Sequence, residues 1–548
     1  MKLSTVFTIY SLATTTCALD KIVIKGSKFF NSISGDQFFI KGLAYQPEKG
    51  DPTPAKQDPL ANPLACERDA PLIKELGVNT IRVYQTDSSN DHDDCVKAFA
   101  DNGIYLMLDI ASASMAIDRD DPSWYVDLFA GYRNKIDAFA KYDNVIGFIA
   151  GNEVANNEKT TPSAAFVKAA IRDVKEYLAK NKLDFPVGYA SNDEPTIRDP
   201  LMDYFNCGDD ASARADFYGA NLYSWCGSKA TFSSSGYDKI TEKFKDYSIP
   251  VLLSEYGCIA ERPRPFNEAK SLYGSDMSAT FSGGFMYMFT EEENNYGIVD
   301  VTYSSSELKK LEEFDIFKNV LSKVSPTGVK MKDYNSSNKI QSCPSPSEAW
   351  KVKSTELPQT PSTKACECMV ESLGCALSKD FTIENPKAAQ ALLKDICSSS
   401  VKCDPIEYDT SKGTYGAFQF CNLKEKLSWA LNAQYELKGK NADSCTVDGF
   451  NTDLKKSPSV SDISTCATKE NDIGMKSSNT GSTSSSGSKN TSKSDSKNTS
   501  KSDSENTSNS SSDSGSKSNA APNYNSPSIF SHSMAGFAIC IVALVTIY

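Results

Sequence analysis

The chain contains the run Val145-Ile-Gly-Phe-Ile-Ala-Gly-Asn152-Glu153 and, further on, the run Ile249-Pro-Val-Leu-Leu-Ser-Glu255-Tyr-Gly257. Each is a short apolar stretch bounded by Gly or Pro, which is typical of a strand buried on both faces of a parallel sheet or barrel. Each also ends at a glutamate. In barrels of alternating strands and helices, the pocket forms at the C-terminal ends of the strands, so both carboxylates are expected there.

Eight short apolar runs lie between residues 37 and 290. They cover residues 38–45, 78–84, 104–110, 145–150, 186–190, 217–223, 250–253 and 284–289. Helical patterns lie between them, for example over residues 164–179, where apolar side chains recur at helical spacing. Eight strand–helix repeats over about 250 residues predict an α/β fold of the (β/α)8, or TIM barrel, type. An open doubly wound sheet is the alternative, but no Gly-rich phosphate loop follows the first strand.

Both ends of the chain match processing signals. Residues 1–18 have a basic tip, a short apolar core and small residues before the cleavage point, as in a secretory signal peptide. At the other end, small residues precede a polar spacer and an apolar tail, which predicts a glycolipid (GPI) anchor at Asn519 and removal of residues 520–548. A transmembrane anchor is the alternative, although the tail is shorter than the roughly 20 apolar residues that a span needs. The mature protein is therefore expected outside the cell, held by lipid.

The cysteine content fits an exported protein. Removal of Cys17 with the signal and of Cys540 with the tail leaves 14 of the 16 cysteines, an even number that predicts disulfides. These are Cys66, Cys95, Cys207, Cys226, Cys258 and Cys343, and a cluster of Cys366, Cys368, Cys375, Cys397, Cys403, Cys421, Cys445 and Cys466. Zinc binding by the cluster is the alternative, but histidine ligands are missing and the spacing of Cys366 and Cys368 does not suit it.

Composition divides the chain into several parts. Residues 19–343 are expected to form the barrel domain, with a last helix over residues 307–321. Residues 344–361 read as a Pro/Ser linker, and residues 362–468 as a small, mostly helical module stapled by four disulfides. Residues 469–519 are rich in Ser, Thr, Lys, Asp and Asn, so they cannot bury a core and are expected to be disordered. Their sequons at Asn490, Asn498, Asn506 and Asn509 predict a glycosylated stalk.

Charge and histidine content exclude several classes of function. The formal net charge is -12 and the pI is near 5.0, which argues against a nucleic-acid partner. Only two histidines are present: His532 lies in the tail, and His92 stands among acids, where we expect a surface loop. Serine and cysteine hydrolase mechanisms need a positioned imidazole and are therefore not expected.

Two carboxylates that face one pocket are the minimum equipment for breaking a glycosidic bond. We interpret Glu255 as the nucleophile, kept ionised by a polar setting, and Glu153 as the acid/base with a raised pKa. Asn152 could hydrogen-bond a sugar 2-hydroxyl, an interaction that strengthens in the transition state. A carboxyl separation of roughly 5 to 5.5 Å would mean retention of configuration, and a wider separation inversion. Asp109 could either bond a sugar hydroxyl or brace a neighbouring side chain.

Several segments carry a family resemblance. They are Ala150-Gly-Asn-Glu-Val154, Asn221-Leu-Tyr-Ser-Trp-Cys-Gly227, Leu253-Ser-Glu-Tyr-Gly-Cys258, Gly283-Gly-Phe-Met-Tyr287 and Ile117-Asp-Arg-Asp-Asp-Pro122. Together they resemble glycoside hydrolase family 72, the fungal GPI-anchored β-1,3-glucanosyltransferases of the cell wall, over residues 20–343. Residues 366–466 similarly resemble the cysteine-rich carbohydrate-binding module that is appended to one subgroup.

The resemblance implies a retaining double displacement that needs no cofactor or metal. A β-1,3-glucan donor is cleaved, and its new reducing end is joined to the non-reducing end of another β-1,3-glucan, which is elongated. By similarity the donor is held by Tyr84, Ser114, Asp118, Arg119, Asp120, Asp121, Asn152 and Tyr287, and the acceptor by Asp193 and Arg198, while Gln46, Asp109 and Tyr223 match further pocket positions. Two residues depart from the family pattern: Asp118 stands where Asn is expected, and Ile259 where a polar residue is commoner.

The same resemblance implies the pairs Cys66–Cys95, Cys226–Cys258 and Cys207–Cys343, and it implies the cell wall as a partner beside the glucan chains and the membrane. Two rival interpretations stay open, a β-1,3-glucanase that mainly hydrolyses and a non-catalytic wall-binding glycoprotein. In the module, Trp429, Tyr415 and Phe418 could stack on glucan or fill a small disulfide core.

Overall fold

A computed structural model describes residues 19–48, 58–302, 305–455 and 457–475. The predicted signal peptide, the anchor site Asn519, residues 520–548 and the stalk beyond residue 475 lie outside the described residues. Within the described residues, no helix is both long and apolar enough to cross a membrane.

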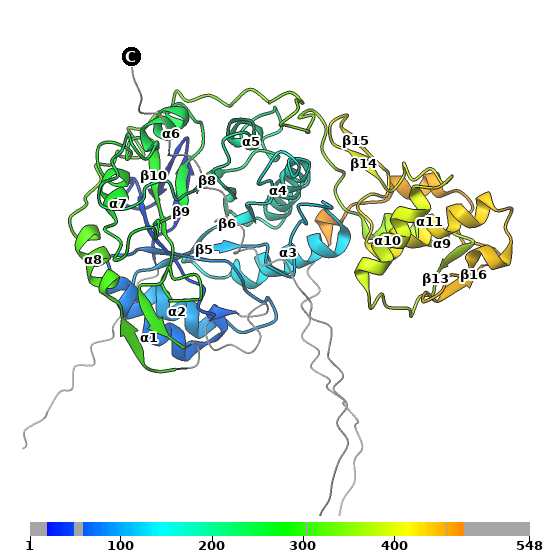
Figure 1. Cartoon of the computed structure of the whole chain (residues 1–548), viewed down its shortest axis with the longest axis horizontal. Coiled ribbons are helices and arrows are strands. Elements are labelled where there is room, and N and C mark those ends of the chain that lie inside the picture. Colours follow the sequence, from blue (N-terminus) through cyan, green and yellow to red (C-terminus); the bar gives the residue numbers. More distant parts are fainter. Residues whose placement is uncertain (1–18, 49–57, 303–304, 456, 476–548) are drawn as a thin grey trace, which may run out of the picture. The chain divides into compact units, whose positions relative to one another are not determined.

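Eight parallel strands close into a barrel (Figure 1). The predicted TIM barrel is therefore confirmed, and the alternative prediction of an open doubly wound sheet is wrong. The strands are β3 (Ile40–Ala44), β4 (Thr80–Val83), β5 (Tyr105–Asp109), β6 (Val145–Asn152), β7 (Val187–Ser191), β8 (Phe217–Leu222), β9 (Val251–Tyr256) and β10 (Phe281–Met286). Closure comes from the parallel pairing of β10 with β3. All eight overlap the apolar runs of the sequence, because the barrel strands are buried on both faces, although β10 begins three residues before its predicted run.

Helices follow most of the barrel strands and cover the barrel (Figure 1). They are η2 (Pro59–Ala61), α1 (Pro63–Glu75), α2 (Asp93–Asp101), α3 (Val126–Phe139), α4 (Ser163–Lys180), α5 (Arg198–Phe205), α6 (Tyr237–Phe244), α7 (Asn267–Leu272) and α8 (Glu312–Leu321). The helix expected over residues 164–179 is α4. Helix α1 begins where the Asn62 side chain accepts from the backbone N–H of Ala65, with Pro63 at its first position.

Two short antiparallel hairpins were not expected. In the first, β1 (Ile22–Lys25) pairs with β2 (Lys28–Asn31), and its Ile22 and Phe29 pack against barrel residues such as Ile40 and Ile146. In the second, β11 (Val299–Val301) pairs with β12 (Leu308–Lys310). The predicted helix over residues 307–321 is therefore wrong at its start, since its first turn is spent in this hairpin and α8 begins only at Glu312.

His92 does not lie in a surface loop, so that expectation was wrong. Its side chain is 2% exposed, and its Nε2 lies 2.7 Å from the Asp58 carboxylate. The ring also packs 4.4 Å from the ring of Phe139. The neighbouring acids misled the prediction: they occupy the exposed first turn of α2, while the imidazole points inward.

Residues 344–361, interpreted as a linker, pack against the barrel domain. Trp350 and Val352 are buried in the same core as the barrel helices, and the Trp350 ring lies 5.2 Å from the ring of Tyr204. Just before this segment, the disulfide Cys207–Cys343 ties the chain to the end of α5. The segment therefore runs along the domain as a fixed strap.

The cysteine-rich module has its own core and is mostly helical. It contains α9 (Thr363–Glu371), β13 (Cys375–Leu377), α10 (Pro386–Cys397), β14 (Tyr408–Asp409), β15 (Thr414–Tyr415), α11 (Leu423–Leu437), η3 (Ala442–Cys445), β16 (Thr452–Leu454) and η4 (Ile463–Thr468). A further turn, η5 (Asp472–Gly474), follows in residues that were expected to begin the disordered stalk, and its Asp472 and Ile473 are buried. The disulfides of the module are Cys366–Cys421, Cys368–Cys466, Cys375–Cys445 and Cys397–Cys403. All eight thiols are thus spent in disulfides, which removes the zinc alternative.

Candidate active site

The two glutamates lie at the same end of the barrel. Glu153 directly follows β6, with its backbone in the left-handed region (φ 50°), and its N–H donates to the Ala190 carbonyl at 2.9 Å. Glu255 lies near the end of β9, in register with Asn221 of β8. Both carboxylates therefore lie at the C-terminal ends of barrel strands, where barrel enzymes carry out their chemistry.

Glu255 is 7% exposed and surrounded by hydrogen-bond donors. Its Oε1 accepts from the Tyr84 hydroxyl at 3.1 Å and from Arg82 at 3.3 Å, and its Oε2 accepts from the Tyr223 hydroxyl at 2.8 Å. The pKa of the Glu255 carboxyl is raised to about 7 in balance: burial is the largest cause and the charge of Glu153 adds to it, while Arg82 and the two hydroxyls oppose the shift. We expected a carboxylate that its polar setting keeps ionised, but desolvation outweighs the donors.

Arg82 is the central cation of the site, and the sequence analysis missed it. It is fully buried, donates to both oxygens of Asp109 at 3.0 and 2.8 Å, and donates to the Asn152 side chain at 3.0 Å. Its guanidinium also stacks 4.3 Å from the Tyr84 ring. An arginine inside the apolar run 78–84 was the available signal, because a charge in a buried strand needs a partner.

Asp109 braces a neighbour in this structure. Its carboxylate is 4% exposed, and both of its oxygens are bound by Arg82. Burial raises the pKa of Asp109, and the Arg82 charge and hydrogen bond oppose that rise. Of the two roles that we left open, the contacts favour the bracing role over a direct bond to a sugar.

Asn221 joins the two halves of the site. Its Nδ2 donates to Glu153 Oε1 at 2.8 Å and to Asn152 Oδ1 at 3.1 Å, and its Oδ1 accepts from Ser254 at 2.7 Å. Because Asn152 also accepts from Arg82, one chain of hydrogen bonds runs from Glu153 to Glu255. Asn221 stood in a segment that carried the family resemblance, but no role was assigned to it.

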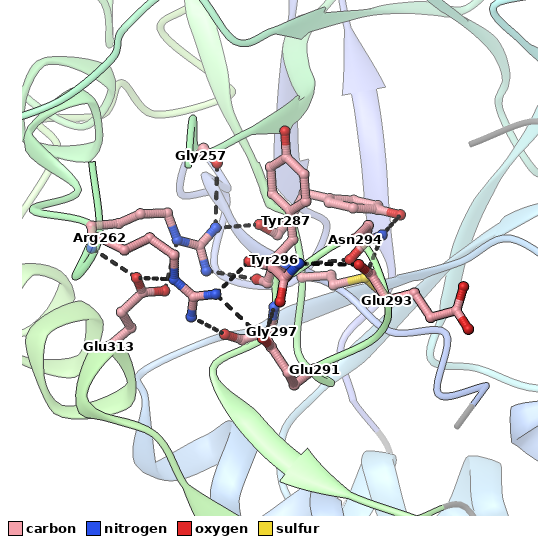
Figure 2. Close-up of polar contacts among 12 residues, drawn as sticks. Gly257, Arg262, Tyr287, Glu291, Glu293, Asn294, Tyr296, Gly297 and Glu313 are labelled. Carbon is pink, nitrogen blue, oxygen red and sulfur yellow. Dashed lines mark hydrogen bonds and ion pairs between the residues drawn. The ribbon is translucent and has the colours of Figure 1, made fainter. Parts of the chain in front are cut away.

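Four tyrosines wall the site beside Glu255. Tyr84 and Tyr223 each meet the Tyr287 ring edge-on, with ring centroids 6.3 and 6.4 Å apart. Tyr296 packs on both Tyr287 and Tyr223, at 5.2 and 5.7 Å. The Tyr287 hydroxyl accepts from Asn294 at 3.4 Å (Figure 2). Tyr296 was missed because it lies in the loop after β10 and not at a strand end.

Gln46 lies just after β3 and is 3% exposed. Its Oε1 accepts from the Gln85 N–H at 3.1 Å, while its Nε2 is buried with no hydrogen-bond partner among the described residues. A buried donor without an acceptor costs about 1–3 kcal/mol, so it is a natural contact for a substrate hydroxyl.

Asp193 and Arg198 follow β7 and form an ion pair, with Nε and Oδ1 2.5 Å apart. Both side chains stay about one quarter exposed, at 24% and 23%. Burial raises the pKa of Asp193, and Arg198 opposes that shift. The pair lies at the same end of the barrel as Glu153, since β7 is the neighbour of β6.

The loop after β5 holds the remaining predicted residues. Ser114, Asp118, Asp120 and Asp121 are exposed and Arg119 is half-buried. Asp118 Oδ1 accepts from the backbone N–H of Asp120 at 2.8 Å, so the aspartate found in place of the expected Asn still folds the turn. These acids line a cleft of about 1340 Å³ whose other wall is the module.

The aromatic side chains of the module are mostly engaged in packing. Phe418 is 4% exposed and lies in the module core, where Trp429 also packs. Tyr415 packs with its ring 6.1 Å from Phe166 of α4. The contacts therefore favour the core-filling interpretation for these three side chains over a stacking platform.

Comparison with known proteins fits this architecture. A closed parallel barrel with two glutamates at strand ends defines a protein of the barrel glycosidase class. The family model "Glucanosyltransferase" of glycoside hydrolase family 72 matches residues 11–325, and the X8 domain model matches residues 373–452. The chain belongs to glycoside hydrolase family 72.

Similar proteins include a 1,3-beta-glucanosyltransferase of Arthroderma benhamiae, which is 42% identical over 80% of this chain and 83% of that protein. The 1,3-beta-glucanosyltransferase GAS2 of Saccharomyces cerevisiae is 40% identical over 78% of this chain and 79% of that protein. A solved structure of Saccharomyces cerevisiae Gas2p in complex with laminaritriose and laminaritetraose is similar with a TM-score of 0.73 and 40% identity, and the match covers 79% of this chain and 97% of that one.

Proposed function

We propose that this protein is a retaining β-1,3-glucanosyltransferase that elongates β-1,3-glucan. The observation that carries the proposal is the hydrogen-bonded chain that links Glu153 and Glu255 across the ends of β4, β6, β8 and β9. Membership of family 72 supports the same reaction, and the laminari-oligosaccharides in the similar Gas2p structure support a β-1,3-glucan as substrate.

Each glutamate has one role in each half of the reaction. Glu255 attacks the anomeric carbon of the donor, and Glu153 gives its proton to the departing glycosidic oxygen, so a glycosyl–Glu255 ester forms and the reducing-end fragment leaves. In the second half, Glu153 takes the proton from a hydroxyl at the non-reducing end of the acceptor. That oxygen displaces Glu255, and the new β-1,3 bond lengthens the acceptor.

The surrounding residues then divide between the two sugar chains. The donor is held by Gln46, Tyr84, Asn152, Tyr223 and Tyr287, and the acceptor by Asp193 and Arg198. The Gln46 Nε2, which has no hydrogen-bond partner among the described residues, and the ion pair of Asp193 and Arg198, which is about one quarter exposed, support this division. Asp109 acts through Arg82, which holds Glu255 and Asn152 in place.

The exposed loop acids Asp118, Asp120 and Asp121 hold a more distant part of a long chain. They form one wall of the cleft, and Lys379, Lys426 and Phe381 of the module lie on the other. Carboxylates and ammonium groups both bond sugar hydroxyls, and an aromatic ring offers a stacking face. The module therefore contributes through this cleft more than through its buried aromatic side chains.

A borohydride-reduced laminari-oligosaccharide separates transfer from hydrolysis. Transfer moves the non-reducing part of one molecule to another, so it gives products longer than the donor and creates no new reducing end. Hydrolysis creates one reducing end for each bond that is cut. We expect longer products with few new reducing ends. Shorter products, with one new reducing end for each bond that is cut, would favour the glucanase, and unchanged substrate would favour the wall-binding protein.

Variants of the two carboxylates test the assignment within the same assay. Glu153→Gln and Glu255→Gln should each lower the yield of longer products at least about 1000-fold, because each removes a group on which both steps depend. Glu158→Gln is the matched control, since that exposed glutamate lies outside the hydrogen-bonded chain. Equal activity in all three variants would contradict both roles.

The cell-surface location is part of the proposal. Its support is the signal-like residues 1–18, the anchor-like residues 519–548 and seven disulfides, which are typical of exported proteins. Treatment of intact cells with a phosphatidylinositol-specific phospholipase should release the enzyme, and Asn519→Gln should prevent its attachment. Retention after both treatments would favour the transmembrane alternative.

A further inference from the structure

Arg264 lies behind the tyrosine wall and links the loops that follow β9 and β10. It is 1% exposed. Its Nη1 donates to the carbonyl oxygens of Tyr287 at 2.6 Å and of Gly257 at 3.3 Å, and its Nη2 donates to the Tyr296 carbonyl at 2.6 Å. Gly257 stands two residues after Glu255. One guanidinium thus binds the backbone beside Glu255, the proposed nucleophile, and the backbone of Tyr287 and Tyr296.

Glu313 of α8 anchors this arginine from outside the site. Its carboxylate is 2% exposed, accepts from the Arg264 Nε and backbone N–H at 2.8 Å each, and also accepts from Arg262 Nε at 2.9 Å. Figure 2 shows Arg262 beside Glu313, with Tyr287 and Asn294 on the far side of the network. A buried carboxylate shared by two arginines is fully paired, so it can hold both in a single geometry.

Besides Glu313, Arg262 binds the loop after β10. Its Nη1 donates to the Asn295 carbonyl at 2.6 Å and to Glu291 at 3.3 Å, and its Nη2 donates to the Gly297 carbonyl at 3.3 Å (Figure 2). The two arginines therefore have different roles. Arg262 fixes the loop that carries Tyr296, and Arg264 fixes that loop relative to the chain that carries the nucleophile.

We propose that Arg264 and Glu313 are positioning residues of the glycosyl transfer, with Arg262 as their partner that holds the loop after β10. They act through Gly257, Tyr287 and Tyr296, and they set the spacing between Glu255 and the tyrosine wall. The proposal rests on the proposed function, because it assigns the wall to the donor sugar.

A lysine cannot replace Arg264 in this role. Arg264 makes five hydrogen bonds, of which four come from its planar guanidinium and point to four separate acceptor groups. An ammonium group has three donors and no fixed fork. A change of about 1 Å in the position of a reacting group can cost about 100-fold in rate.

The test is the kinetics of the full mature chain on reduced laminari-oligosaccharides. Arg264→Lys should lower kcat and raise KM, with kcat/KM down about 10- to 100-fold, because both loops lose their link. Glu313→Gln should do the same to a smaller extent. Arg262→Lys should raise KM several-fold and leave kcat within about twofold, because its guanidinium binds Glu313 and the loop after β10, whereas the bond to the Gly257 carbonyl beside Glu255 comes from Arg264.

The matched control is Arg133→Lys. Arg133 is also a buried arginine, 5% exposed, and it donates to two backbone carbonyls, those of Asp472 and Met475, away from the site. Its substitution should lower the melting temperature and leave kcat/KM of the folded enzyme within about twofold.

The outcomes separate cleanly. If Arg264→Lys and Glu313→Gln lose thermal stability as Arg133→Lys does but keep wild-type kcat and KM below their melting temperatures, the positioning role is overturned. If Arg264→Lys does not fold, the KM increase expected of the partly exposed Arg262 still decides, and an unchanged KM overturns the proposal. If the wild-type chain itself gives only shorter products, the proposed function fails, and the same comparison of kcat and KM for hydrolysis still decides this inference.

Discussion

At the scale of single residues, two opposing effects set the pKa of the Glu255 carboxyl. Burial and the nearby carboxylate of Glu153 raise its pKa, which comes to about 7 in balance. Arg82 and the hydroxyls of Tyr84 and Tyr223 pull the pKa down. A nucleophile must be ionised to attack, so the fraction of active enzyme depends on this balance. Activity should therefore fall as the pH drops below about 7.

Tyr223→Phe tests that balance. The variant removes the hydroxyl that donates to Glu255 Oε2 at 2.8 Å, so the carboxylate loses a stabilising bond and the pKa of Glu255 rises further. A hydrogen bond to a charged group contributes about 1.5–3 kcal/mol, which corresponds to about one to two pH units. The acidic limb of the kcat/KM profile should move up by about one unit. Tyr296→Phe is the control, and a limb that stays in place or moves down would contradict this reading.

Asp109→Asn distinguishes bracing from sugar binding. If the carboxylate acts through Arg82, the variant leaves a buried guanidinium with half of its pairing, which costs about 3–5 kcal/mol of stability. In the folded enzyme kcat should fall while KM for laminari-oligosaccharides stays within about twofold. A large rise of KM with an unchanged melting temperature would instead mean that Asp109 binds the sugar directly.

For single residues, the sequence predicted which side chains carry the chemistry but not which side chains they contact. Glu153 and Glu255 could be found because each ends an apolar run. Arg82 and Asn221 were missed because their importance depends on which strands become neighbours, and only closure of the barrel brings β4, β6, β8 and β9 to one site. The raised pKa at Glu255 could not be foreseen either, since desolvation depends on the packing of four tyrosines from the loops after β4, β8 and β10.

At the scale of elements, disulfides tie loops that are distant in sequence. Cys226–Cys258 joins the loops after β8 and β9, and Cys66–Cys95 joins α1 to α2. Cys207–Cys343 closes a span of 136 residues, whereas Cys397–Cys403 closes a span of only 6. The entropy that a crosslink removes from the unfolded chain grows with the span, so these bonds should differ in their contribution to stability.

Replacing both cysteines of a pair by serine measures the difference. Loss of Cys207–Cys343 should lower the free energy of unfolding by about 5 kcal/mol and loss of Cys397–Cys403 by about 2 kcal/mol, on the chain-entropy estimate. Chemical denaturation of the two double variants under non-reducing conditions supplies both values. Equal losses, or a larger loss for the short span, would show that chain entropy does not govern these bonds.

The barrel strands could be predicted, and the small hairpins could not, for the same physical reason. A strand buried on both faces, such as β5 or β9, must be apolar throughout and is visible in sequence. The strands β1, β2, β11 and β12 have three or four residues each and carry exposed or half-exposed polar side chains. Their pairing depends on contacts with the barrel, which the sequence does not reveal. The helical pattern over residues 307–321 therefore predicted the start of α8 in the wrong place.

At the scale of the whole molecule, the barrel domain and the cysteine-rich module share buried contacts. The backbone N–H of Val126 donates to the Phe420 carbonyl at 3.1 Å, and Val126 lies in the module core. In return, Ile473 lies in the core of the barrel domain. Arg133 of α3 donates to the Asp472 carbonyl at 2.7 Å. The module and the residues that follow it therefore pack against the barrel domain at α3.

A chain that ends after residue 361 should be less stable than one that ends after residue 479. It would expose Val126 and leave Arg133 without its carbonyl partners, and each loss costs about 1–3 kcal/mol. Calorimetry should show a melting temperature several degrees lower for the shorter chain. Identical melting temperatures would mean that the barrel does not depend on these contacts.

The central claim is that sugar passes through the protein as an ester of Glu255, with Glu153 as the proton carrier. Its most direct test is the mass of the Glu153→Gln variant after reaction with a laminari-oligosaccharyl fluoride, whose leaving group needs no acid. We expect one glycosyl adduct for each chain, on the peptide that contains Glu255, and none when Glu255 is also changed to Gln. An adduct on another carboxylate, or none while the fluoride is consumed, would contradict the claim.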